Sequence, residues 1–252
     1  PFSMKQNKLI FMDILSSEFT KYAANVFLAT KVSFMNEISR LTAKLGVDIE
    51  SVRLGIGSDS RIGYKFIYPG CGFGGSCFPK DLSSLRYVAR SNKIDTPILD
   101  AVQLVNRQQK HFLADKVKQH FGDDLSGKTF AIWGLSFKPG TDDMRKAPSL
   151  VIINDLIDAG ASIKAYDPMF NKDILDKLDI KDKTKITCYN DMYGALDESD
   201  ALILVTEWQV FRSPDFDKIK EKLSEAVVFD GRNIFNPKDM KELGINYFSV
   251  GR

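Results

Sequence analysis

The segment KTFAIWGLSFKPGTDDMRKAPSLVIINDLIDAGASIKAYDP, residues 128–168, determines the fold class of this chain of 252 residues. It begins with an apolar run at 129–133 that has the length of a buried strand. A helix is predicted over 148–159, because Pro148 suits the first position of a helix. A second strand over 162–166, which ends at Asp167-Pro168, completes a strand–helix–strand unit. Such a unit is typical of a parallel sheet.

The same alternation continues to the end of the chain. Short strands are predicted at 185–188, 201–205, 227–229 and 247–250, with a helix capped by Asp191 after the first of them. Apolar strands that alternate with helices indicate a doubly wound parallel sheet, which binds ligands at the carboxyl ends of its strands. The polar residues at those ends are Lys138, Asp142, Arg145, Asp167, Thr206, Glu207, Asp230, Arg232 and Asn233.

The first half of the chain has a helical pattern instead. Apolar residues recur at nearly helical spacing over 17–45, which predicts one long helix. Its other faces are also apolar, so we expect this helix to be buried between subunits or domains. Shorter helices are predicted over 48–55 and 96–120, and the polar, turn-rich segment 122–127 marks the boundary of a second unit.

The segment GFGGSCFPKD, residues 72–81, carries the clearest chemical signal. A helix is predicted to begin near residue 78, which places Cys77 at its N-terminal end. Backbone N–H groups and the positive end of the helix dipole favour a thiolate there, as covalent catalysis requires. The alternative is an inert, buried cysteine beside a tight turn. Asp81, four residues on, shares a face with Cys77, and Lys80 is a cation that the dipole disfavours, which indicates an anionic ligand.

Four other positions have two interpretations each. Lys21 and Asn25 share one face of the long helix and form either a polar site or a solvated patch near the helix start. Lys138 follows a strand and either faces a phosphate or is a solvated loop lysine. Arg232 either grips a phosphate or carboxylate, or forms a surface salt bridge. Residues 70–75 match G-x-G-x-x-G, but no strand precedes them, so we reject a dinucleotide fingerprint there.

Composition limits the possible functions. The chain is 44% hydrophobic and 27% charged, as expected of a globular protein, and its net charge of +2 gives no reason to expect nucleic acid or a membrane as a partner. No apolar run has the length of a membrane span. Cys71, Cys77 and Cys188 lack metal-type spacing, which favours reduced thiols in a cytoplasmic protein without a metal site. His111 and His120 are predicted at the surface, so we do not expect histidine-based catalysis.

Five motifs occur in the order found in one known family. They are KYAAN at 21–25, DSRIG at 59–63, the segment 72–81, FKPGTDDMR at 137–145 and DGR at 230–232. Over essentially its whole length the chain therefore closely resembles the UDP-glucose 6-dehydrogenases of the UDP-glucose/GDP-mannose dehydrogenase family. The resemblance implies an α/β fold in which a central, all-helical dimerisation domain with a long helix precedes a Rossmann-like, doubly wound parallel sheet.

The resemblance also implies how the chain is divided. Residues 1–16 would be the tail of an N-terminal NAD-binding domain that this chain lacks, and Pro1, which is not an initiator methionine, agrees with a fragment. Residues 17–122 would form the dimerisation domain with the catalytic cysteine, and 123–252 the Rossmann-like domain that binds the UDP-sugar. Because the main NAD site would lie on the missing domain, we expect this chain alone to be inactive.

The family oxidises C6 of UDP-glucose to a carboxylate with two NAD and one water. By resemblance, Cys77 is the nucleophile that forms a thiohemiacetal and then a thioester. Lys21 and Asn25 resemble the pair that steadies the oxyanion and positions the substrate. Asp81 resembles the carboxylate that assists proton or water handling. The catalytic residues so implied are Cys77, Asp81, Lys21 and Asn25.

Ligand-binding positions follow from the same resemblance. Lys80 and Arg145 match contacts to NAD. The substrate-binding positions implied are Lys21, Arg61, Phe66, Ile67, Tyr68, Pro69, Gly70, Phe73, Gly74, Lys138 and Arg232. Arg61 resembles an arginine that reaches the substrate of the partner subunit, which implies a homodimer through the long helix.

Two alternatives stay open. The first is a sister dehydrogenase that oxidises C6 of GDP-mannose or of a UDP-N-acetylhexosamine, because the cysteine segment does not separate these enzymes well. Residues 21–37 resemble the UDP-glucose group more closely. The second is a dimerisation module without a catalytic role.

Overall fold

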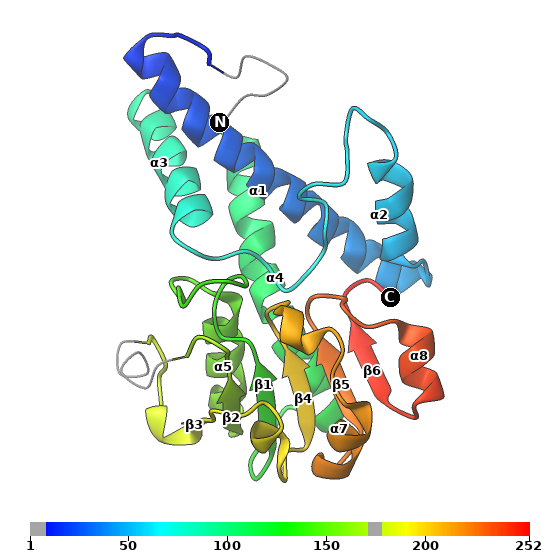
Figure 1. Cartoon of the computed structure of the whole chain (residues 1–252). Coiled ribbons are helices and arrows are strands. Elements are labelled where there is room, and N and C mark those ends of the chain that lie inside the picture. The colour runs from blue at the N-terminus through cyan, green and yellow to red at the C-terminus, as the bar shows by residue number, and fades with distance from the viewer. Residues whose placement is uncertain (1–8, 171–177) are drawn as a thin grey trace.

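A computed structural model describes residues 9–170 and 178–252 (Figure 1). The chain begins with the helices α1 (Ile14–Leu45), α2 (Ile49–Gly57), α3 (Cys77–Ser91) and α4 (Pro97–Phe121). Strands and helices then alternate: β1 (Thr129–Trp133), α5 (Pro148–Asp158), β2 (Ser162–Tyr166), η1 (Lys183–Lys185), β3 (Ile186–Cys188), η2 (Gly194–Leu196), β4 (Ala201–Leu204), η3 (Gln209–Phe211), α7 (Phe216–Lys222), β5 (Val227–Asp230), α8 (Pro237–Glu242) and β6 (Asn246–Ser249).

The long predicted helix is confirmed as α1, and it begins three residues earlier than predicted. Asp13 caps its start, because the carboxylate accepts a hydrogen bond from the backbone N–H of Ser16 at 2.9 Å. Gly46 ends the helix in the left-handed conformation, with φ of 68°. The helix predicted near residue 78 begins at Cys77 and continues to Ser91.

The sheet has the order β3-β2-β1-β4-β5-β6, and every neighbouring pair is parallel. The predicted doubly wound parallel sheet is therefore confirmed, and each predicted strand agrees with the observed one to within one residue at either end. The order reverses between β1 and β4, so the loops after these two strands run in opposite directions and leave a crevice at the carboxyl edge.

The helix predicted after Asp191 was wrong. Only the single 3₁₀ turn η2 forms there. The Asp191 carboxylate does accept the backbone N–H of Gly194 at 2.6 Å, as a cap would. The segment is too short to continue as a helix, because β4 begins at Ala201.

Both faces of the sheet are covered, as Figure 1 shows. Alternate residues of β1 point to opposite sides, so that Phe130 contributes to one hydrophobic cluster and Trp133 to the other. The first cluster also contains Leu113 and Val117 of α4, together with the apolar face of α5. The C-terminal half of α4 therefore packs against the sheet and joins the two halves of the chain.

Within one chain, α1 is buried along one face only. Val26 and Ala29 face α3 and α4 and are almost fully buried. Apolar side chains on other faces are between 55% and 66% exposed: Phe19, Phe27, Phe34, Leu41 and Leu45. These faces are open in a single chain, so burial of the helix between subunits or domains stays a prediction.

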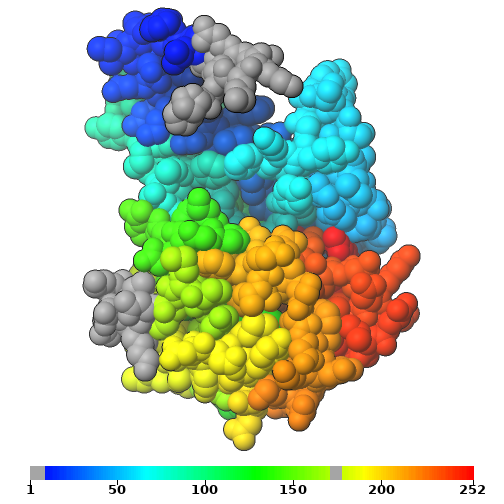
Figure 2. Space-filling model, viewed as in Figure 1, coloured from blue at the N-terminus to red at the C-terminus, as the bar shows by residue number. Residues whose placement is uncertain are grey.

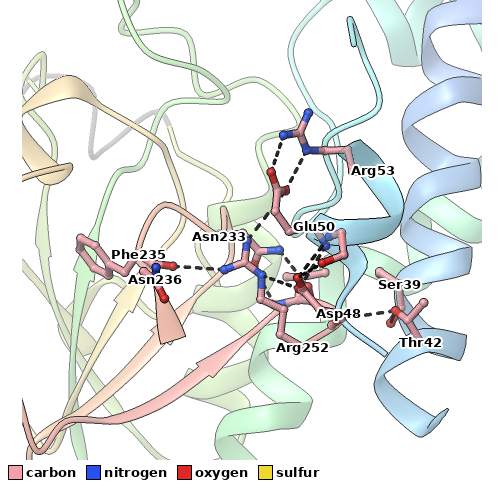
Figure 3. A network of polar contacts seen from close by, with 12 residues as sticks. Ser39, Thr42, Asp48, Glu50, Arg53, Asn233, Phe235, Asn236 and Arg252 are labelled. Atoms are coloured by element: carbon pink, nitrogen blue, oxygen red, sulfur yellow. Dashed lines mark hydrogen bonds and ion pairs between the residues drawn. The ribbon is translucent and has the colours of Figure 1, made fainter. Parts of the chain in front are cut away.

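The two halves of the molecule meet along its middle, where the last residues lie against the turn between α1 and α2 (Figure 2). The Gly251 carbonyl accepts the backbone N–H of Ile49 at 3.0 Å. Arg252 reaches Asp48 and Glu50, and it also donates to the Phe235 carbonyl at 3.2 Å (Figure 3). Among the described residues, no helix is both long enough and apolar enough to cross a membrane.

Candidate active site

A cleft of about 680 Å³ opens where the helical half meets the carboxyl edge of the sheet. We call it the Cys77 cleft. Its lining comes from α1, from the loop before α3, from the first residues of α3 and from the loops after β1, β4 and β5. The lining residues are Asn25, Leu28, Val32, Lys65, Phe66, Tyr68, Gly72, Phe73, Gly74, Cys77, Phe78, Phe137, Lys138, Glu207 and Arg232.

The glycine-rich loop before α3 passes very close to the sheet half. A Cβ atom added to Gly74 would lie 2.5 Å from the carbonyl oxygen of Lys146, so no larger residue fits without moving that backbone. The backbone N–H of Gly75 donates to the Arg145 carbonyl at 2.8 Å. Phe73 is held on both sides by Asn106, whose amide accepts its N–H at 2.8 Å and donates to its carbonyl at 3.1 Å. The loop is thereby fixed over the cleft.

Cys77 is the first residue of α3, at the N-terminal end of the helix as the sequence predicts, and its side chain is exposed. The hydroxyl of Ser76 lies 3.8 Å from its sulfur. Asp81 is the main group that raises the pKa of Lys80, and Asp143 is the main group that raises the pKa of Arg145. A negative charge on Cys77 would add to both effects, so both cations lie near the thiol. A nucleophile here would have two cations beside it and the N-terminal end of a helix dipole behind it.

Asp81 is fully buried against α1 and lines no part of the Cys77 cleft. Its carboxylate accepts hydrogen bonds from Asn25 Nδ2 at 2.6 Å and from Lys80 Nζ at 2.5 Å. Burial opposes its ionisation, but these two hydrogen bonds, with the charges of Lys80 and Lys21, lower the pKa of Asp81 below its usual value. The cation at the start of α3 therefore has a partner within the chain.

Arg232 is anchored at the carboxyl end of β5. Its Nε donates to the Val205 carbonyl at 2.6 Å and lies 3.1 Å from a Glu207 carboxylate oxygen. The next turn is fixed by Asp230, which is fully buried and accepts backbone N–H groups of residues 232, 234 and 235. Lys138 Nζ lies 5.4 Å from the centre of the Phe137 ring. The cleft thus combines cationic groups at the sheet edge with aromatic walls.

The structure brings eight predicted residues together in the cleft: Asn25, Phe66, Tyr68, Phe73, Gly74, Cys77, Lys138 and Arg232. The other predicted residues lie outside its lining: Lys21, Arg61, Ile67, Pro69, Gly70, Lys80, Asp81 and Arg145. Ile67 packs with Met35 and Ile49 in a small hydrophobic cluster. Arg61 is exposed and pairs with Asp59 at 2.6 Å.

Sequence reasoning missed seven lining residues: Leu28, Val32, Lys65, Gly72, Phe78, Phe137 and Glu207. Leu28 and Val32 follow Asn25 at three and seven residues, so helical spacing could have placed them on the same face. Glu207 stood among the polar residues at strand ends but was not selected. Within the two described ranges, no cluster of His, Cys, Asp and Glu side chains could hold a metal ion.

A parallel sheet in this order defines a doubly wound α/β protein, and its cleft lies over the carboxyl edge at the topological switch point, where sheets of this kind bind ligands. The chain belongs to the UDP-glucose/GDP-mannose dehydrogenase family. Residues 15–108 match the central domain of that family and residues 131–237 match its UDP-binding domain.

Individual relatives cover the whole chain. The UDP-glucose 6-dehydrogenase of Pseudomonas aeruginosa is 46% identical over 253 aligned residues, which are 100% of this chain and 56% of that protein. The structure of a UDP-glucose dehydrogenase from Pyrobaculum islandicum is similar with a TM-score of 0.81 at 33% identity, over 95% of this chain and 52% of that one. The chain therefore spans about half the length of these relatives.

Proposed function

We propose that this chain is the cysteine-bearing, UDP-sugar-binding part of an NAD-dependent UDP-glucose 6-dehydrogenase, which converts UDP-glucose to UDP-glucuronate. The proposal depends above all on the Cys77 cleft. In that cleft an exposed thiol at a helix N-terminus shares one cavity with Lys138 and Arg232 at the edge of a doubly wound sheet. The family match and the names of the relatives support the same activity.

In this proposal the UDP group binds at the sheet edge. Lys138 and Arg232 neutralise the diphosphate, and the fixed position of Arg232 against the Val205 carbonyl lowers the entropy lost on binding. The aromatic residues Phe66 and Phe73 enclose the nucleotide sugar. The sugar then extends toward Cys77, which places its C6 within reach of the sulfur.

The chain's chemical contribution is the thiol. When C6 has been oxidised to the aldehyde, the Cys77 thiolate adds to the carbonyl carbon, and the carbonyl oxygen becomes the oxyanion of a thiohemiacetal. Loss of hydride from this carbon gives a thioester. Water then adds to the thioester, the C–S bond breaks, and the carboxylate leaves while the thiol is regenerated. NAD, when bound, accepts one hydride in each of the two oxidations.

Lys21, Asn25 and Asp81 act together in this scheme. Asn25 lines the cleft and donates to Asp81, and the positive charge of Lys21 lies near the same carboxylate. We propose that Lys21 and Asn25 steady the oxyanion at C6, while Asp81 holds Asn25 in place and assists the handling of protons and water.

The described residues fit NAD only in part. Lys80 and Arg145 are exposed cations near Cys77, a suitable position for contacts to the part of NAD that accepts hydride. The glycine-rich loop before α3 follows no strand, so it is no dinucleotide fingerprint. We therefore propose that the main NAD site belongs to chain beyond these residues, and that this chain alone does not turn over substrate.

We further propose a homodimer through α1. The exposed apolar side chains of that helix, Phe27 and Phe34 among them, would be covered by a second copy, and the exposed Arg61 would reach the partner's cleft. Light scattering tests this: a monomeric mass for the unmodified chain would contradict the proposal.

We also propose that the protein is cytoplasmic, because the three unpaired thiols of this chain favour that compartment. Cell fractionation checks this.

Ligand binding and turnover test the proposal separately. UDP and UDP-glucose should each raise the melting temperature of this chain, and Lys138→Gln should reduce that shift. Parallel titrations with GDP-mannose and a UDP-N-acetylhexosamine test sugar preference. In the intact protein, Cys77→Ser should abolish UDP-glucuronate formation while UDP still binds. Undiminished UDP-glucuronate formation by that variant would refute the role of Cys77.

A further inference from the structure

A second cleft, of about 500 Å³, lies between α3, α4 and the segment that precedes α5. It shares Phe73 and no other residue with the lining of the Cys77 cleft. The charged residues of its lining are Arg86, Asp100, Arg107, Lys110 and Lys146. With four cations and one carboxylate, it carries a surplus of positive charge, and we call it the basic cleft.

The carboxylate in this lining is already neutralised. Asp100 forms an ion pair with Arg86, and Arg90 approaches the same oxygen at 3.8 Å. Among the described residues, the side chains of Arg107, Lys110 and Lys146 form no ion pair. Arg107 and Lys110 are three residues apart on α4, so they lie on the same face of that helix. Three cations therefore line one cavity without a counter-charge.

Lys110 is held in an unfavourable environment. Its ammonium group donates to the Lys146 carbonyl at 2.6 Å, and its stem lies beside Gly72. Burial, together with the nearby charge of Lys146, lowers the pKa of Lys110 to about 8, against a partial opposing effect of Cys71. Lys110 is partly buried beside the exposed Lys146, so an anion bound between the two ammonium groups would offset their repulsion and the desolvation of Lys110.

Lys146 adds a second unfavourable feature. Its backbone adopts a left-handed conformation, with φ of 53°, which residues other than glycine rarely adopt. Strained backbone of this kind is found preferentially at active sites and ligand sites. Two unfavourable features thus meet at the wall of one open cavity.

We propose that the basic cleft is a binding site for a small organic phosphate, distinct from the Cys77 cleft. The phosphate would lie among the cations of Arg107, Lys110 and Lys146, since a guanidinium and two ammonium groups together suit a dianion. The carbon part would rest on the apolar lining residues Pro79, Leu82 and Leu104. The volume lies within the range of small-molecule sites. The inference does not rest on the proposed dehydrogenase function, because it uses none of the residues assigned to catalysis.

The test is a calorimetric titration of this chain with inorganic phosphate and, separately, with glycerol 3-phosphate, at constant ionic strength. UDP is present at saturation, so that the Cys77 cleft is filled. Saturable binding in the millimolar range or tighter is expected. The double variant Arg107→Gln/Lys110→Gln should weaken it by about tenfold or more, the loss expected when charge-assisted hydrogen bonds are removed.

Matched controls separate the site from general charge effects. Lys116→Gln/Lys118→Gln removes the same charge from α4 outside the basic cleft and should leave binding unchanged. The single variant Lys110→Arg keeps a positive charge at this position and should retain most of the affinity for phosphate. Lys138→Gln, titrated without UDP, should still bind phosphate, so failure of the proposed function would leave this result intact. Equal binding by the double variant and the unmodified chain, or a response that chloride reproduces, would overturn the proposal.

Discussion

At the scale of single residues, the three thiols of this chain occupy three environments. Cys71 is completely buried, and burial raises its pKa. Cys188 is partly buried, and burial raises its pKa to about 11. Cys77 is exposed at the start of a helix. Since the thiolate is the reactive form, burial and a raised pKa both lower the reactivity of Cys71 and Cys188.

Thiol alkylation at pH 7.5 should therefore single out Cys77. With iodoacetamide under native conditions, we expect Cys77 to react at least about tenfold faster than Cys71 and Cys188. Peptide mass spectrometry at several time points measures all three rates in one sample. The Cys77→Ser variant is the control, and it should lose the fast phase entirely. Comparable rates for all three thiols would contradict the assignment.

Asp81 makes stability depend on pH. Its pKa is lower in the folded chain than its usual value of 3.8, so the folded state binds the proton less readily than the unfolded state. Its contribution is therefore present above about pH 4 and is lost as the pH falls through the lowered pKa. Asp81→Asn should cost about 1–3 kcal/mol at pH 7, because it weakens the hydrogen bonds from Asn25 and Lys80.

Urea unfolding at pH 7 and at pH 3 measures this effect. The difference between the unmodified chain and Asp81→Asn should shrink at the lower pH. Asp95→Asn, at an exposed position, should match the unmodified chain at both. A constant difference would show that ionisation of Asp81 does not stabilise the fold.

The sequence alone could identify Asn25 and Asp81 but not their contact. Each was selected from its own local pattern, Asn25 from the polar face of α1 and Asp81 from its spacing to Cys77. Their hydrogen bond joins positions 56 residues apart and depends on how α1 packs on α3. Because local spacing carries no such information, it assigned Asp81 to the side of Cys77, whereas the carboxylate is buried against α1.

At the scale of elements, the glycine loop before α3 is where shape matters most. Gly74→Ala would place a methyl group 2.5 Å from the Lys146 carbonyl and 2.8 Å from Ala147 Cα. Both atoms belong to the backbone, so one of the two loops must shift. We expect a loss of about 1–3 kcal/mol in the free energy of unfolding and weaker binding of UDP. Thermal unfolding with and without UDP measures both.

Gly55→Ala is the matched control for that substitution. Gly55 lies inside α2 with open space around its Cα, so a methyl group meets no atom. It should leave the chain equally stable or more stable by about 0.5–1 kcal/mol, because alanine favours a helix more than glycine does. If both variants lost stability equally, steric fit at Gly74 would not be the cause.

The sequence could predict helices and strands that have a strong apolar pattern, but it could not predict which face of a helix is buried. β1 and β2 have the predicted bounds, because β1 is a short apolar run, β2 alternates polar and apolar residues, and both are set off by polar residues, glycine or proline. The helix after Asp191 failed because a good capping residue does not guarantee enough chain to continue the helix. In α1, apolar residues on nearly every side left periodicity unable to choose the buried face, which α3 and α4 decide.

At the scale of the whole molecule, the site arises where two halves meet. The Cys77 cleft combines residues from Asn25 to Arg232, and only the packing of the helical half on the sheet brings them together. The sequence could order the motifs and place two of them at strand ends. It could not show that Lys65 and Glu207 complete the lining, or that a basic cleft lies beyond Phe73. The angle between the halves therefore sets the geometry of both clefts.

Arg252, the last residue of the chain, ties the halves together outside the lining of either cleft. Its Nε lies 3.3 Å from an Asp48 carboxylate oxygen, and one of its NH groups donates to the Phe235 carbonyl at 3.2 Å (Figure 3). Its side chain is only 13% exposed, so solvent screens these contacts less than at the surface. The neighbouring Gly251 carbonyl adds the hydrogen bond from Ile49.

Loss of this tie should therefore weaken the whole fold. Arg252→Gln removes the charge that faces Asp48 and Glu50. Among the described residues Asp48 is then left without an ion-pair partner, whereas Glu50 keeps Arg53. We expect a loss of about 1–2 kcal/mol in the free energy of unfolding, since the variant loses the hydrogen bond to the Phe235 carbonyl together with an ion pair whose Asp48 side chain is 47% exposed. Urea unfolding measures it, and the exposed Arg212→Gln serves as control. Because Arg252 works by charge, 1 M salt should narrow the gap between the variant and the unmodified chain; a gap that salt leaves untouched would mean that packing, not the ion pair, holds the halves together.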